Sequence, residues 1–201
     1  VYVQRCGRNM SWTTFFVALF CVSGISSERY ADLYMDTVLD IILPRTIGGE
    51  NLASAPLDEL VVNGTAAKIT GQAFAFKRRG ECGPSQWMDN ADISLNCNIT
   101  VRILQVVYNC ENETQLLLVK INSTIPVHVT ENTDHETTIG AKIPDVNQFI
   151  VYKGTTKHNE CWNDVIAETA RNSTFHFFTR QLWPVVESAF RETYLPYPDD
   201  V

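Results

Sequence analysis

The widest band of apolar residues in the chain lies near its C-terminus, between Ser173 and Pro196. Apolar side chains recur there at spacings of three and four residues, the period of an α-helix. One band consists of Phe175, Phe178, Leu182, Val185 and Ala189, and a second band beside it consists of Phe177, Trp183, Val186, Phe190 and Tyr194. A surface helix on a sheet needs only one band, so we predict a long helix that other parts of the chain wrap. Pro184 is expected to bend or break it locally.

A second helix is predicted near the start of the chain, from Ser27 to Leu43. Its apolar face consists of Tyr34, Met35, Val38, Leu39, Ile41 and Ile42. Pro44 is expected to end the helix, because proline has no backbone N–H to donate. Residues 47–56 are expected to form a loop.

The middle of the chain alternates between apolar and polar residues, as strands with one buried face do. In the first clear run the inward residues are Ile93, Leu95, Cys97, Ile99, Val101 and Ile103. In the second run they are Leu117, Val119, Ile121, Ile125 and Val127. Residues 137–143 and 147–153 are predicted to form a last strand pair or one interrupted strand. The order of helix, long strands and helix predicts an α+β fold in which a curved antiparallel sheet wraps around the long C-terminal helix.

The first residues have the pattern of a secretory signal peptide. The chain begins with Val, and Met10 is one candidate start; an apolar run over 12–22 is followed by small residues. This run is too short to cross a bilayer comfortably, which argues against a membrane anchor. We therefore expect residues 1–26 to be removed by cleavage near positions 24–26. Residues 27–201 would then form one secreted, extracellular domain without integral membrane association.

Five glycosylation sequons follow the predicted cleavage zone. Their acceptors are Asn63, Asn98, Asn112, Asn122 and Asn172. A glycan needs solvent, and Asn98 and Asn122 both fall on the polar faces of their predicted strands. The sequons therefore agree with the strand faces and with export.

Four cysteines remain outside the leader, an even number, as expected in an oxidising compartment. They are Cys82, Cys97, Cys110 and Cys161. Connectivity cannot be read from sequence, but the predicted hairpins favour Cys82–Cys97 with Cys110–Cys161.

Catalytic motifs are missing from the chain, so we expect no enzyme, no catalytic residue and no cofactor. The four histidines lack partners at metal-ligand spacing, and no metal is expected. The acidic group Glu131, Asp134 and Glu136 is interpreted as a solvated loop, with a calcium site as the alternative. Arg78 and Arg79 are interpreted as a small basic surface spot. The net charge of −7 argues against nucleic acid as a partner.

The segment NGTAAKITGQAFAFKRRGEC, which ends at Cys82, together with the predicted architecture, resembles the mite group 7 allergen-like proteins. These belong to the tubular lipid-binding superfamily, with juvenile-hormone-binding proteins and bactericidal permeability-increasing protein. The resemblance covers about Arg29 to about Leu195. It implies a hydrophobic tunnel between a long helix and a curved sheet.

A hydrophobic small molecule or lipid is therefore the expected ligand. The expected lining residues are Phe175, Phe178, Leu182 and Val185 on one side, with Ile99, Val101, Val119 and Ile121 opposite. The competing hypothesis is a secreted protein with a filled core that binds a receptor or host protein, such as an arthropod salivary or haemolymph effector.

Overall fold

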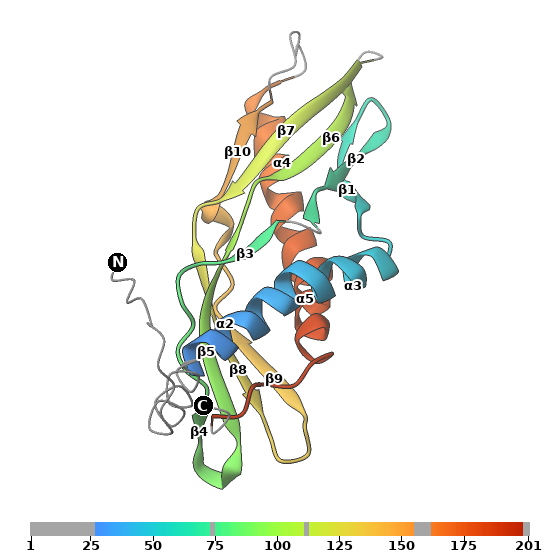
Figure 1. Cartoon of the computed structure of the whole chain (residues 1–201). Helices are drawn as coiled ribbons and strands as arrows, with labels where there is room; N and C mark the ends of the chain where they lie inside the picture. The colour runs from blue at the N-terminus through green and yellow to red at the C-terminus, as the bar shows by residue number, and fades with distance from the viewer. Residues whose placement is uncertain (1–26, 73–74, 111–112, 155–161, 199–201) are drawn as a thin grey trace, which may run out of the picture.

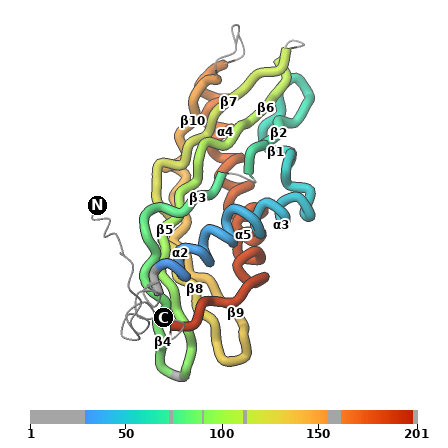
Figure 2. Tube along the Cα trace, viewed as in Figure 1, coloured from blue at the N-terminus to red at the C-terminus, as the bar shows by residue number. Residues whose placement is uncertain are grey.

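The computed structural model describes residues 27–72, 75–110, 113–154 and 162–198. Two helical rods and two antiparallel sheets make up the fold, which confirms the predicted α+β class. The two sheets lie one beyond the other along the length of the molecule (Figures 1 and 2). The expected signal peptide, Asn112 and Cys161 lie outside the described residues.

Both sheets are antiparallel throughout. The first has the strand order β1-β2-β6-β7-β10 and consists of β1 (Ser54–Val62), β2 (Thr65–Thr70), β6 (Leu104–Cys110), β7 (Glu113–Ile121) and β10 (Phe149–Lys153). The second has the order β3-β5-β8-β9 and consists of β3 (Phe76–Arg78), β5 (Ile93–Val101), β8 (Thr124–Glu131) and β9 (Thr137–Ala141), with β4 (Gln86–Trp87) paired to β5. Two 3-10 turns, η3 (Asp89–Ala91) and η4 (Val146–Gln148), precede β5 and β10.

Two of the passages from one sheet into the other, which we call crossings, are very short. Only Arg102 and Ile103 separate β5 from β6, and only Asn122 and Ser123 separate β7 from β8. The long strands predicted from the sequence are therefore real, but each is divided between two sheets.

The first of these crossings changes which residues face inward. Val101 is buried at the end of β5, and the buried series resumes at Leu104 instead of Ile103. Ile103, predicted to face inward, is instead 48% exposed, because the crossing shifts the alternation by one residue. β9 and β10 belong to different sheets, so residues 137–143 and 147–153 form the interrupted strand and not a pair.

The final helical rod consists of α4 (Asp164–Phe177), the π-helical turn η5 (Phe178–Leu182) and α5 (Trp183–Phe190). It begins nine residues before the predicted start at Ser173, with Asn163 as its N-cap. α4 contacts both β1 and β10, the two edge strands of the first sheet. A sheet whose two edges contact one helix must curve around that helix, as predicted.

The N-terminal rod consists of α2 (Ser27–Thr37), η1 (Val38–Ile42) and α3 (Leu43–Gly49). The prediction that Pro44 ends this helix was wrong, since the rod continues for five residues beyond it. Ile41, predicted on the apolar face, is 63% exposed. The wider π turn rotates this position away from the face that Tyr34 and Val38 bury.

Both rods continue beyond a proline, and the same local structure makes this possible in each. In each rod a π-helical turn precedes the proline, and the backbone N–H just before the proline donates five residues back: Leu43 to Val38, and Trp183 to Phe178. The wider register accommodates the ring and the missing N–H without ending the rod. Pro184 therefore produces a local irregularity, as predicted, but the helix continues to Phe190.

The hairpin between β1 and β2 turns at Asn63 and Gly64. Val62 pairs with Thr65, and both turn residues have positive φ, 51° and 76°. This is the two-residue turn that Asn-Gly favours. The expected loop over 47–56 is shorter than predicted, because α3 and β1 both extend into it.

Buried residues from both sheets and both rods form one hydrophobic cluster. Tyr34 joins the rods: its hydroxyl donates to the Phe190 carbonyl at 3.4 Å, and burial raises the pKa of this phenol, with the charge of Glu131 adding to the shift. Tyr194, predicted to be in the second apolar band, is 66% exposed because the helix ends before it.

Candidate functional site

The interior around the final helix is packed with aromatic rings. Phe178 lies with its ring centroid 6.1 Å from that of Phe76 and 5.7 Å from that of Phe149. Phe149 also contacts Phe175 edge-on at 5.5 Å. Phe178 therefore meets side chains from β3 and β10, one strand from each sheet.

The eight residues predicted to line a tunnel all belong to this core or pack against it. Ile99, Val101, Val119, Ile121, Phe178 and Leu182 are buried, and Phe175 and Val185 are partly buried. Val101 and Ile121 differ from the rest because they also border a hollow on the outside of the molecule.

This hollow arises where hydrogen bonding between neighbouring strands is interrupted. The pairing of β5 with β8 ends at Thr100 and Thr124, and the pairing of β6 with β7 begins at Leu104 and Val119. Between these pairs the two crossings face each other without a ladder.

The backbone at each crossing instead bonds to a different neighbour. The Arg102 N–H donates to the Ala75 carbonyl at 2.6 Å, and the Asn122 N–H donates to the Gln148 carbonyl at 2.8 Å. Each crossing segment is therefore held by the residue next to an edge strand, Ala75 before β3 and Gln148 before β10. The two crossings separate, and we call the opening between them the crossing cleft.

The crossing cleft has a volume of about 610 Å³, within the range of small-molecule sites. Val101 and Ile121 border it with 4% and 3% exposure, and Ile103 adds an exposed apolar side chain. The polar and charged residues around it are Arg79, Thr100, Arg102, Lys120, Asn122 and Ser123. An apolar base beside several polar groups is the usual composition of a ligand site.

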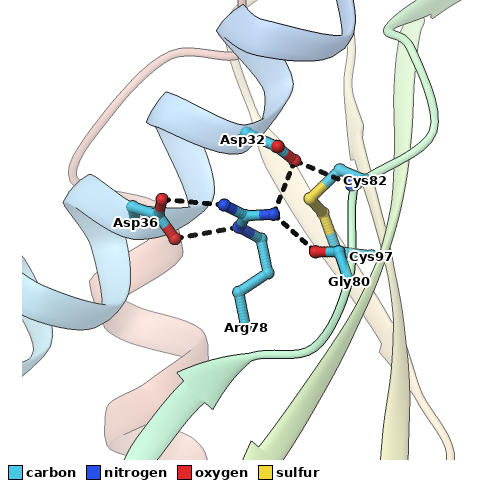
Figure 3. Close-up of a disulfide and its surroundings, with 6 residues drawn as sticks. All are labelled: Asp32, Asp36, Arg78, Gly80, Cys82 and Cys97. Carbon is cyan, nitrogen blue, oxygen red and sulfur yellow. Dashed lines mark hydrogen bonds and ion pairs between the residues drawn. A yellow bond between two sulfur atoms is a disulfide. The ribbon is translucent and has the colours of Figure 1, made fainter. Parts of the chain in front are cut away.

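The two adjacent arginines at the end of β3 have different surroundings. Arg78 makes two hydrogen bonds to the Asp36 carboxylate, at 2.9 and 3.0 Å, and an ion pair with Asp32 at 3.0 Å (Figure 3). The hydrogen bond to Asp36 raises the pKa of Arg78. Arg79, exposed at the crossing cleft, donates to the Thr124 hydroxyl at 2.6 Å. The sequence interpretation of both as a surface spot was therefore wrong for Arg78, which ties β3 to α2.

The Cys82–Cys97 disulfide lies beside this tie. The bond is present with the two Cα atoms 4.5 Å apart, as predicted. Asp32 accepts a hydrogen bond from the Cys82 backbone N–H at 2.7 Å while it pairs with Arg78 (Figure 3). Cys110 is also disulfide-bonded, and its expected partner Cys161 lies outside the described residues.

Four of the predicted glycan acceptors are exposed: Asn63, Asn98, Asn122 and Asn172. Asn122 lies at the edge of the crossing cleft. Asn172 lies within α4, because this helix begins at Asp164 and not at the predicted Ser173.

The acidic group near the β8–β9 turn is solvated at Asp134 and Glu136, as predicted, but not at Glu131. Glu131 is only 2% exposed, accepts a hydrogen bond from the Leu195 N–H at 2.6 Å and contacts His135 Nδ1 at 2.7 Å. Asp134 and Glu136 are exposed. Glu131 therefore fastens the segment after α5 to the second sheet.

Sequence reasoning missed most of the crossing cleft. Ile103 was placed on an inward strand face, and neither this residue nor Arg102 nor Lys120 was predicted as a site residue. The available signal was the adjacent apolar pair Ile103 and Leu104, which breaks the alternation and indicates an irregular strand.

Metal-binding clusters and membrane-spanning helices are absent from the described residues. No group of three or more His, Cys, Asp or Glu side chains there is placed to hold a metal ion. No helix in this part of the chain is long and apolar enough to cross a membrane. Comparisons of the chain with protein-family models and with curated proteins found no match.

Proposed function

We propose that this protein is a secreted glycoprotein that binds a hydrophobic or amphipathic small molecule, such as a fatty acid or another lipid. The observation that carries the proposal is the crossing cleft, an opening of about 610 Å³ bordered by the buried side chains Val101 and Ile121 and by the exposed Ile103. Removing the apolar part of a ligand from water would supply roughly 25 cal/mol per Å² of buried surface.

Two observations favour the crossing cleft over a tunnel around the final helix. The ring of Phe178 lies within 6.1 Å of rings from β3, β10 and α5, so protein side chains surround it. The cleft, in contrast, is open to a ligand without displacement of core residues. The resemblance to tubular lipid-binding proteins supports lipid as the ligand class but had suggested the interior as its site.

Export and glycosylation are supported by the exposed acceptors and the disulfide. Asn63, Asn98, Asn122 and Asn172 all lie at the surface. The Cys82–Cys97 bond fits an oxidising compartment, where structural disulfides persist.

Lipid extraction and a displacement titration test the binding proposal. Protein secreted from cultured cells is analysed by native mass spectrometry and then titrated with a fluorescent fatty acid. We expect Ile103→Ser to weaken binding by about three- to tenfold, because it removes an apolar contact of order 1 kcal/mol. Ile41→Ser is the matched control, since Ile41 is also exposed but lies on the N-terminal rod.

A protein that carries no lipid and binds none of the probes would overturn the proposal. Equal losses of probe affinity in the Ile103→Ser and Ile41→Ser proteins would show that the crossing cleft is not the binding site.

Protein binding is the second candidate function. It is favoured by two exposed aromatic side chains, one on β4 and one on the segment after α5. β4 lies at one end of the molecule (Figure 1). Trp87 and Tyr197 are 44% and 43% exposed, with ring centroids 6.0 Å apart. Aromatic side chains are enriched at protein interfaces. An unliganded protein whose binding to a partner depends on Tyr197 would support this function instead.

A further inference from the structure

We infer that the crossing cleft selects a ligand with an anionic head group, a carboxylate or a phosphate, attached to an apolar chain. This inference rests on the proposed function and specifies its ligand class. It is carried by three cationic side chains, Arg79, Arg102 and Lys120, that surround an opening with apolar walls.

The charge of the cleft is opposite to that of the whole protein. The chain has 23 acidic and 16 basic residues and a net charge of −7. Three basic residues nevertheless border this one opening, and no Asp or Glu is among its lining residues. General solvation of an acidic surface does not require such a concentration of positive charge. An anionic ligand would be attracted to it even against the overall charge.

The cations of the cleft also differ from other cations of the protein in their partners. Arg45, Lys77 and Arg78 each pair with a carboxylate. In the described part of the chain, neither Arg102 nor Lys120 pairs with a carboxylate, and Arg79 donates to a neutral hydroxyl. All three residues are exposed. An ionised carboxylate or phosphate is the acceptor that guanidinium and ammonium groups bind most strongly.

Apolar and cationic groups are arranged side by side around the opening. Val101 and Ile121 form its buried part. Arg102 directly follows Val101, Lys120 directly precedes Ile121, and both cations are exposed. All four residues border the same opening, so the head group and the chain of one ligand would contact neighbouring residues of the same two segments. A bare anion would leave the exposed side chain of Ile103 uncovered, and a neutral lipid would leave the cations unpaired.

Calorimetric titration with four probes tests this inference. The probes are dodecanoate, dodecyl phosphate and dodecanol, which share one chain length, and inorganic phosphate. They are titrated into the secreted protein and into its Asn122→Gln variant, which lacks the glycan acceptor at the edge of the cleft. We expect both anionic amphiphiles to bind at least about tenfold more tightly than dodecanol, because each gains charge-assisted hydrogen bonds. The ratio between the two identifies carboxylate or phosphate as the preferred head.

Charge-neutralising variants locate the effect. The double substitution Arg102→Gln with Lys120→Gln is expected to lower the affinity for the anionic probes about tenfold and leave that for dodecanol unchanged. The matched control is Lys68→Gln with Arg180→Gln, which removes the same charge at exposed positions outside the cleft. The control should change the affinity less than about twofold, since distant surface charges are screened. Equal thermal melting of the two doubles verifies folding.

The outcomes separate the inference from the function on which it rests. Equal binding of dodecanol and dodecanoate, or equal losses in the two double variants, would overturn head-group selection while lipid binding stands. Tight binding of inorganic phosphate alone would overturn the need for an apolar chain. No binding of any twelve-carbon probe, with or without the Asn122 acceptor, would overturn the proposed function itself.

Discussion

The interior around the final helix and the crossing cleft contain similar apolar residues, but the surroundings of these residues differ between the two regions. In the interior, Phe178 is enclosed by aromatic rings from β3, β10 and α5. At the cleft, Val101 and Ile121 belong to the same core but lie where the ladder between strands is interrupted. The course of the backbone, and not the residue composition of the two regions, causes this difference. An alternating pattern therefore identifies inward residues without telling which of them border an opening.

The largest expected effect tests whether the interior is filled. Phe178→Ala should lower the free energy of unfolding by about 3–5 kcal/mol, because it removes a fully buried ring and leaves a cavity among other rings. Urea denaturation of ligand-free protein measures the change.

Phe175→Ala is the matched control, since Phe175 is only partly buried on the same helix. Its loss should be clearly smaller. If Phe178→Ala instead cost less than about 1 kcal/mol, the space around Phe178 would not be closely packed, and the interior would return as the candidate ligand site.

The next effect compares the adjacent arginines. Arg78→Gln should lower the free energy of unfolding by about 1–2 kcal/mol, because it removes paired, charge-assisted hydrogen bonds between β3 and α2. Arg79→Gln should change it by less than about 0.5 kcal/mol, as expected for an exposed side chain. Urea denaturation of both proteins gives the comparison. Equal losses would show that the two arginines share one structural role.

The smallest effect concerns ligand affinity. Arg79→Gln should weaken the binding of dodecanoate about threefold, since one cation of three is lost and the other two remain. Arg78→Gln should leave the affinity unchanged, because Arg78 is engaged by Asp32 and Asp36. Fluorescence displacement measures both. A larger loss of dodecanoate affinity in Arg78→Gln than in Arg79→Gln would show that Arg78, and not Arg79, contacts the ligand.

Much of the fold followed from local patterns. The exposed positions of Asn98 and Asn122 and the buried face of Leu117, Val119 and Ile121 were predicted because alternation reports directly on strand faces. The curved sheet around the final helix was predicted from the width of its apolar bands. The Cys82–Cys97 bond followed from the predicted hairpins.

The errors arose where neighbouring elements decide the outcome. Pro44 was expected to end a helix, but packing of α3 against α5 favours a continued rod, which a π-helical turn makes compatible with the proline. Ile103 was expected inside, but the backbone of Arg102 bonds to Ala75 and displaces the alternation. Glu131 was expected in solvent, but the segment that returns after α5 covers it. Each depends on a partner far away in sequence, which a local pattern does not contain.

Photo-crosslinking tests the central claim most directly. A dodecanoic acid analogue with a diazirine on its chain is bound to the purified protein and irradiated. Peptide mass spectrometry then locates the labelled residues. The crossing cleft predicts labels within residues 100–103 and 120–123, with competition by unlabelled dodecanoate. Competed labels confined to residues 175–186 of the final helix would contradict the account and place the ligand in the interior.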